Sequence, residues 1–275
     1  MSVFLSITLV TMLLLGALPS LSVAVAPLAL SCTAPDEVTR FKVTLPYTTR
    51  AIRRGEALVI VAIGSSSTQG IGASDQAHAY PPLLAEELRH RWPRLIVTVV
   101  NKGVNGETVE QMLARFPRDV LPYRPQLVIW QTGSNSVLQS RDVQGYEHTL
   151  REGIVQLKEA HMDVILMDPQ YAPRILGRPL HKAIVDIINE VSDDLQVAIF
   201  RRFAVMRYWV TSGQYTMEDL ISPDQLHMND VSYHCIAHLL ADSLASAVLG
   251  ALLPQVDRPL TTDSPSHASM PGIPR

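Results

Sequence analysis

Short apolar runs alternate with helical patterns along most of the chain, and this alternation limits the fold more than any other feature. Each run has the length of a strand and ends at turn-forming or polar residues. The runs span residues 57–63, 95–100, 127–130, 164–167 and 197–200, and helical patterns begin at Tyr80 and span 108–121, 146–161, 180–195 and 233–253. Apolar strands separated by helices predict a parallel sheet that is covered on both faces.

The right-handed rule for strand crossovers converts this pattern into a specific architecture. We predict an α/β fold, a flavodoxin-like three-layer α/β/α sandwich with a five-stranded parallel sheet. A length of 275 residues with 47% apolar content suits one large domain, which we place at residues 32–253. Residues 254–275 are rich in Pro, Ser, Thr and Asp, and we expect a disordered tail there.

Polar residues follow the first three expected strands. The run of residues 64–70 contains three consecutive serines between two glycines, Gly106 lies after the second strand, and Asn135 lies after the third. The carboxyl ends of parallel strands meet at one edge of the sheet, where open α/β sheets bind ligands. A serine hydroxyl at this edge can act as a nucleophile if a base lies within hydrogen-bond reach.

A carboxylate and an imidazole occur far downstream, three residues apart. Asp224 and His227 follow Pro223 and precede the last helical pattern, which begins after Asp230. One short loop can therefore supply both a general base and the group that orients it.

In this chain order, the four polar blocks resemble those of the SGNH hydrolases, also called the GDSL esterase/lipase family. The resemblance covers roughly residues 57–250. The family's first block reads Gly-Asp-Ser-x-Thr-x-Gly, and its alignment on Gly64, Thr68 and Gly70 selects Ser66 among the three serines.

Two positions depart from the family pattern. Ser65 occupies the usual Asp position of the first block, and Ser136 follows Asn135 where the third block usually has Asp. Neither position is one of the family's three catalytic residues, the Ser, His and Asp of its triad. The departures therefore bear on the positioning of Ser66 and on substrate choice.

The resemblance implies a role for each site residue. Ser66 would be the nucleophile, His227 the base and Asp224 the orienting carboxylate. The backbone N–H groups of Ser66 and Gly106 and the side-chain amide of Asn135 would form the oxyanion hole. This chemistry needs no cofactor and no metal.

We therefore expect a serine ester hydrolase that acts on short acyl esters, such as acetyl esters of a carbohydrate or small molecule. Two alternatives use the same fold. An O-acyltransferase would pass the acyl group to a sugar hydroxyl, and a catalytically silent binding protein would keep the pocket without the activity.

Two further polar residues follow the fourth and fifth strands. Asp168 and Arg202 are candidates for substrate binding, with a turn-capping aspartate and a loop-bracing arginine as the alternative roles. His234 and His238 lie four residues apart on the last helix, but no third metal ligand is evident in the sequence.

Residues 2–31 contain no charged side chain and read as an export segment, which predicts a periplasmic or extracellular protein. The apolar stretch before Pro19 is shorter than the ~20 residues of a membrane span. The alternatives are an uncleaved membrane anchor and a lipid-modified Cys32.

Only two cysteines are present, Cys32 and Cys235. Since an exported chain meets an oxidising compartment, we predict that they form a disulfide; the alternative is two unrelated thiols.

The formal net charge is −3, and acidic and basic residues are interspersed. The sequence has no basic footprint for nucleic acid. A membrane is an expected partner only if the N-terminal segment stays uncleaved.

Overall fold

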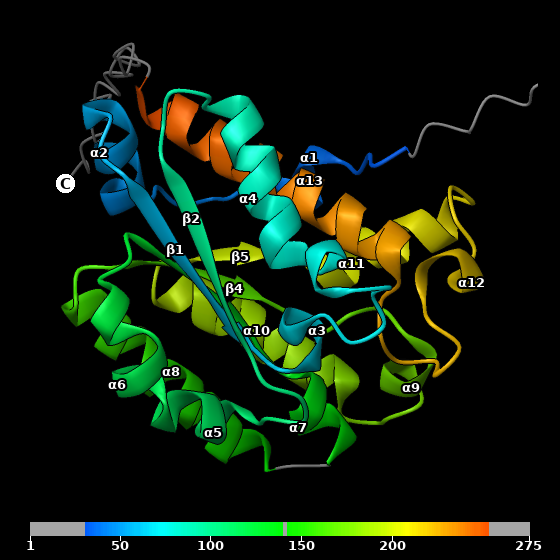
Figure 1. Cartoon of the computed structure of the whole chain (residues 1–275). Coiled ribbons are helices and arrows are strands. Elements are labelled where there is room, and N and C mark those ends of the chain that lie inside the picture. The colour runs from blue at the N-terminus through cyan, green and yellow to red at the C-terminus, as the bar shows by residue number, and fades with distance from the viewer. Residues whose placement is uncertain (1–30, 140–141, 253–275) are drawn as a thin grey trace, which may run out of the picture. The chain divides into compact units, whose positions relative to one another are not determined.

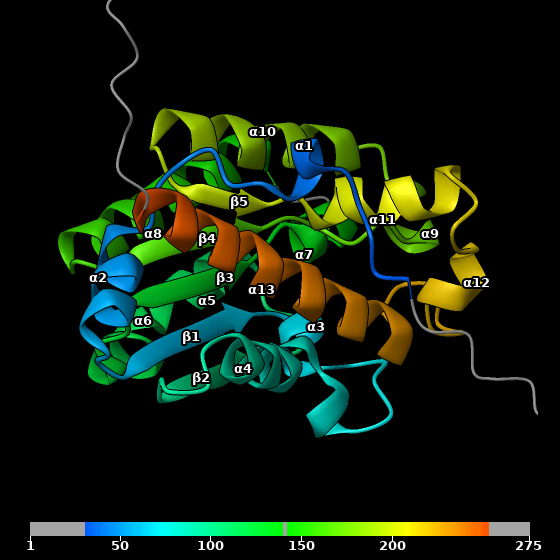
Figure 2. The ribbon, with the colours of Figure 1, turned by 90° about the horizontal axis from the view of Figure 1, so that it is seen from above.

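The computed structural model describes residues 31–139 and 142–252. The expected export segment and tail therefore lie outside the described residues, apart from Ser31. A single sheet contains five parallel strands in the order β2-β1-β3-β4-β5 (Figure 2). The strands are β1 (Leu58–Gly64), β2 (Val97–Gly103), β3 (Leu127–Gln131), β4 (Asp163–Met167) and β5 (Ala198–Phe200). This strand order is that of flavodoxin-like sheets, so the predicted fold class is confirmed.

Helices cover both faces of the sheet (Figure 1). Helices α4 and α13 lie on one side, and α5, α6 and α8 lie on the other. The α-helices are α1 (Asp36–Thr39), α2 (Pro46–Arg54), α3 (Ser66–Gln69), α4 (Tyr80–Arg91), α5 (Val109–Ala114), α6 (Phe116–Asp119), α7 (Ser134–Leu138), α8 (Val143–Glu159), α9 (Pro173–Leu176), α10 (His181–Asp194), α11 (Arg202–Thr211), α12 (Met217–Leu220) and α13 (Asp230–Leu252). In the described part of the chain, two 3-10 turns span Gln76–His78 and Leu121–Tyr123.

The sequence of the strands explains why they are covered. Strands β1, β3, β4 and β5 are apolar and buried almost throughout, as expected for strands with helices on both faces. The edge strand β2 is only partly buried over most of its length. The five expected strands are all present, and none of their ends shifts by more than three residues.

The prediction of one continuous helix over residues 108–121 is wrong. The structure has two short helices there, α5 and α6, which meet at Arg115. Pro117 lies in the first turn of α6, where its missing N–H costs nothing, but it cannot continue a helix from α5. Arg115 at the break is buried, with 6% of its surface exposed.

Glycines let the carboxyl ends of β1 and β2 approach the turn that follows β1. Gly64 pairs with Gly103 at the end of the two strands. A Cβ atom at Gly64 would collide with Thr68 Oγ1, and one at Gly103 would collide with the backbone of Gln69. Helix α3 can therefore begin immediately after β1 and lie against both strand ends.

Helix α13 is long and apolar enough to cross a membrane by length and composition. Half of that stretch is buried against the rest of the fold, as in the core helix of a sheet-based domain. It packs beside α4 (Figures 1 and 2).

The candidate substrate contacts Asp168 and Arg202 lie in the interior. Asp168 has 1% of its surface exposed and Arg202 has none. Arg202 Nε donates to the Asp168 carbonyl oxygen at 2.9 Å, and Asp168 Oδ1 accepts from the Phe203 N–H at 2.8 Å. These contacts join the end of β4 to the start of α11, which is the bracing role that the sequence offered as the alternative.

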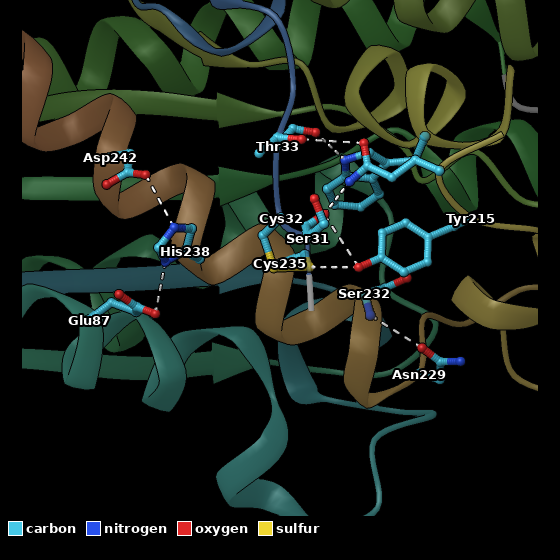
Figure 3. The surroundings of a disulfide bond; sticks show 12 residues. Ser31, Cys32, Thr33, Glu87, Tyr215, Asn229, Ser232, Cys235, His238 and Asp242 are labelled. Atoms are coloured by element: carbon cyan, nitrogen blue, oxygen red, sulfur yellow. Dashed lines mark hydrogen bonds and ion pairs between the residues drawn. A yellow bond between two sulfur atoms is a disulfide. The ribbon is translucent and has the colours of Figure 1, made fainter. Parts of the chain in front are cut away.

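The structure contains the disulfide expected between Cys32 and Cys235, which are 203 residues apart in the sequence. Hydrogen bonds hold the same N-terminal segment nearby (Figure 3). Trp209 Nε1 donates to the Thr33 carbonyl oxygen at 2.8 Å, and the Tyr215 hydroxyl donates to the Ser31 carbonyl oxygen at 3.3 Å. The bridge therefore ties this segment to α13, whose first turns follow the loop that carries Asp224 and His227.

We expect reduction of this disulfide to lower the melting temperature. Opening a loop of this length gives the unfolded chain more conformational freedom, and removing a native disulfide typically costs about 2–5 kcal/mol. Thermal unfolding with and without reductant measures the effect. The Cys32→Ala/Cys235→Ala variant, which should not respond to reductant, is the control. Two reactive thiols in the unfolded, unreduced protein would contradict the bridge.

Because Asp168 is buried, we expect the free energy of unfolding to depend on pH. Burial raises the pKa of Asp168 to about 7 in the folded protein, although the Phe203 N–H and the Arg202 charge lower it. In the unfolded chain its pKa is ~3.9, so between these values the folded state binds more protons and the free energy of unfolding falls as pH rises. Asp168→Asn keeps an acceptor for the Phe203 N–H but does not titrate.

Urea unfolding of wild type and Asp168→Asn, at several pH values between about 5 and about 8, measures this contribution. We expect wild type to lose stability relative to the variant as pH rises. Parallel curves for the two proteins would contradict the assignment.

Candidate active site

Ser66 lies at the first position of α3, directly beyond the carboxyl end of β1. The side chain is mostly buried, with 7% of the residue exposed. The following residues close a tight turn: the N–H groups of Gly70 and Ile71 both donate to the Ser66 carbonyl oxygen. The hydroxyl is therefore held at the edge of the sheet where three strands end, as the sequence predicted.

A hydrogen-bond chain joins Ser66 to His227 and Asp224. The Ser66 Oγ to His227 Nε2 distance is 2.9 Å, and the His227 Nδ1 to Asp224 Oδ2 distance is 2.5 Å. An ionised carboxylate only accepts, so Nδ1 carries the ring proton and Nε2 keeps its lone pair toward the serine hydroxyl. The order nucleophile, base and orienting carboxylate is the one used in serine hydrolases.

The loop between α12 and α13, residues 221–229, carries both partners and is called the histidine loop below. Asp224 Oδ1 accepts from the backbone N–H groups of Leu226 and His227, each at 2.9 Å. Burial raises the pKa of Asp224, but the hydrogen bonds from His227 and Leu226 outweigh it and hold the pKa below its usual value. The carboxylate is thus ionised at neutral pH and fixed against the imidazole.

Two backbone donors lie at this sheet edge without an acceptor. Within residues 31–139 and 142–252, the N–H groups of Ser66 and Gly106 donate to no protein acceptor. Gly106 has φ +80°, and a Cβ there would meet no atom within 4 Å. The glycine is therefore needed for its left-handed backbone conformation and not because of crowding by the protein.

Asn135 is anchored through one of its two amide hydrogens. Its Nδ2 donates to the Glu107 carbonyl oxygen at 2.8 Å, which holds α7 against the Gly106 turn. The amide nitrogen has a second hydrogen that this bond leaves available for an oxyanion. Gln139, at the end of the same helix, donates to the Gly106 carbonyl oxygen at 3.3 Å.

A buried guanidinium braces this turn. Arg115 Nη2 donates to the carbonyl oxygens of Gly64 at 3.2 Å and Lys102 at 2.7 Å, and Nε donates to Glu107 Oε2 at 2.6 Å. Its remaining Nη1 donates to Asp119 at 3.0 Å. Arg115 therefore ties the ends of β1 and β2 to the turn that carries Gly106.

Ser65, at the first position that departs from the family pattern, binds the end of β3. The Gln131 side-chain oxygen accepts from the Ser65 N–H at 2.9 Å, from Ser65 Oγ at 3.1 Å and from Thr68 Oγ1 at 3.2 Å. All three residues are buried. Gln131 thus holds the turn that carries Ser66 on β3. Ser136, at the second departure, is buried, with 1% exposed.

The structure brings together Ser66, Asp224 and His227, and it places Gly106 in the turn after β2 and Asn135 on α7. Sequence reasoning missed Gln131 and Arg115. A polar residue at the end of an apolar strand is a weak signal for the first, and the sequence contains no signal for the second. Among the described residues no group of three His, Cys, Asp or Glu side chains could hold a metal, and His238 pairs with Glu87 and Asp242.

The chain matches one family model and several known proteins. The model of the Non-GDSL lipase-like family matches residues 31–250. The thioesterase 1/protease 1/lysophospholipase L1 of Escherichia coli strain K12 is 27% identical over 173 residues, which cover 63% of this chain and 79% of that protein. The acetylxylan esterase of Geobacillus stearothermophilus is 34% identical over 90 residues, covering 29% of this chain and 41% of that protein.

Among solved structures, a two-domain esterase active on acetylated mannans aligns with a TM-score of 0.65 and 20% identity, over 77% of this chain. The chain spans 55% of that protein, and the likeness concerns the fold. Because the family model covers most of the chain, the chain belongs to the Non-GDSL lipase-like family of the SGNH hydrolases and is a carboxylic ester hydrolase.

Proposed function

We propose that the protein is an exported serine esterase that removes short acyl groups, such as acetyl, from a carbohydrate or small molecule through an acyl-enzyme on Ser66. The observation that carries the proposal is the hydrogen-bond chain from Ser66 Oγ through His227 to Asp224. A serine hydroxyl without such a base is a weak nucleophile at neutral pH.

The first half of the reaction forms the acyl-enzyme. Ser66 Oγ attacks the ester carbonyl carbon as its proton passes to His227 Nε2, and Asp224 stabilises the imidazolium that results. The carbonyl oxygen becomes an oxyanion, which accepts from the N–H groups of Ser66 and Gly106 and from the Asn135 amide. His227 then returns its proton to the departing alcohol oxygen as the ester C–O bond breaks.

The second half uses the same groups. A water molecule gives a proton to His227 Nε2 and attacks the acyl carbonyl carbon, and the bond to Ser66 Oγ breaks. Ser66 takes the proton back and the carboxylic acid leaves. An acceptor hydroxyl in place of water would give acyl transfer, so analysis of products with and without a glycan separates the two reactions.

The substrate class rests on the relatives. One relative is named an acetylxylan esterase, and one solved neighbour is an esterase active on acetylated mannans. Both names describe acetyl esters of a carbohydrate, which supports a substrate of this class here.

The proposal that the protein is exported rests on the disulfide together with the uncharged N-terminal sequence. Disulfides persist in oxidising compartments such as the periplasm and the extracellular space. The bridge between Cys32 and Cys235 begins just after the uncharged stretch of residues 2–31.

Ser66→Ala tests the proposal. We expect wild type to hydrolyse p-nitrophenyl acetate faster than the octanoate ester, and the variant to lose at least about 1,000-fold in kcat. A fluorophosphonate probe should label wild type and not the variant. Full activity in Ser66→Ala would refute the nucleophile, and an unlabelled, inactive wild type would favour a silent binding protein.

Asn135→Ala should lower kcat by about 100- to 1,000-fold with little change in KM, because the amide would bind the oxyanion and not the ground-state ester. Steady-state kinetics on the acetate ester measure both constants. Gln139→Ala is the matched control, since Gln139 contacts the same turn from the same helix but is not a proposed oxyanion donor. Equal losses in the two variants would indicate that only the turn's position matters.

A further inference from the structure

The side chain of Gln170 joins three elements around the candidate active site. Gln170 follows β4 and has 1% of its surface exposed. Its Oε1 accepts from Ser134 Oγ at 2.8 Å and from Arg202 Nη2 at 3.1 Å, and its Nε2 donates to the Leu226 carbonyl oxygen at 3.0 Å. Ser134 begins α7, Arg202 begins α11, and Leu226 belongs to the histidine loop.

The partners fix the orientation of the amide. A guanidinium can only donate and a carbonyl oxygen can only accept, so the Gln170 oxygen must face Arg202 and its nitrogen must face Leu226. A flipped amide would oppose donor to donor and acceptor to acceptor. Gln170 therefore specifies one relative position of α7 and the histidine loop.

Arg202 makes this connection rigid. It is fully buried, and its Nε is held by the Asp168 carbonyl oxygen at the end of β4. No carboxylate within the described residues lies in salt-bridge contact with Arg202, so its bond to Gln170 is a charge-assisted bond to a neutral acceptor. The amide is thus fixed to the body of the sheet.

Two of the residues that bind Gln170 lie next to proposed active-site residues in the sequence. Ser134 precedes Asn135, the proposed oxyanion donor, and Leu226 precedes His227, the proposed base. These two groups must act on the same substrate carbonyl, although their elements are 92 residues apart in the sequence (227 against 135). A displacement of ~1 Å between such groups can reduce the rate about 100-fold.

We propose that Gln170 is a positioning residue for ester hydrolysis, which sets the histidine loop against the oxyanion-binding helix α7. This inference rests on the proposed function. Within the described residues Gln170 makes no side-chain hydrogen bond to Ser66 or His227, and it acts through Ser134 and Leu226.

Gln170→Glu separates this role from general stability. A glutamate has the same length, and one oxygen can still accept from Ser134 and Arg202, with an added ion pair to the buried guanidinium. The second oxygen would face the Leu226 carbonyl oxygen, so a hydrogen bond is replaced by repulsion. The change therefore acts on the histidine loop while the other two contacts remain.

We expect Gln170→Glu to lower kcat on p-nitrophenyl acetate by at least about tenfold, with KM within about twofold of wild type. The rate of fluorophosphonate labelling should fall in parallel. Ser192→Ala is the control for loss of a buried hydrogen bond, because Ser192 Oγ donates to the Val197 carbonyl oxygen at 2.8 Å, before the amino end of β5. It should lose stability but keep kcat.

Ser134→Ala provides a second test that does not depend on the folding of Gln170→Glu. It removes only the bond between α7 and Gln170, and we expect kcat to fall at least about threefold at constant KM. The inference is overturned if both variants fold and keep the wild-type kcat, or if Ser192→Ala loses as much. If wild type neither hydrolyses esters nor reacts with the probe, the proposed function fails and takes this inference with it.

Discussion

The parallel pairing of β1 with both β2 and β3 is the constraint on which the candidate active site depends. Gly64 at the end of β1 pairs with Gly103, and Ile63 pairs with Trp130 of β3. The three strands therefore end at the same level, and the segments that follow them, α3, the turn after β2 and α7, carry Ser66, Gly106 and Asn135. A shift of register would separate these groups along the strand axis.

Side chains buried beneath these turns convert that alignment into a fixed site. Gln131 holds the serine turn to β3, Arg115 holds the Gly106 turn to β1 and β2, and Gln170 joins α7 to the histidine loop. Each takes several backbone or side-chain partners from different segments. A buried polar group left without partners is costly, so each of these networks favours a single arrangement of its turns.

The two departures from the family pattern leave the hydrogen-bond chain intact. Ser65 stands where the family has Asp, and it contributes its backbone N–H and hydroxyl to Gln131. A carboxylate at that position could not donate to the same oxygen. The serine thus fits the glutamine that the chain has at the end of β3, and the carboxylate that faces His227 comes from the histidine loop.

The sequence by itself determined the fold class, the five strands and the members of the Ser66–His227–Asp224 chain. Strand and helix periodicity are local properties, and the polar blocks follow strands whose ends must meet at one edge. The resemblance to the SGNH hydrolases selects Ser66 among the three serines. Only the tertiary structure decided the roles of Arg115, Gln131 and Gln170 and the burial of Asp168 and Arg202. The contacts of these residues join segments far apart in the chain, and a polar side chain that braces a turn has the same local sequence signal as one that faces solvent.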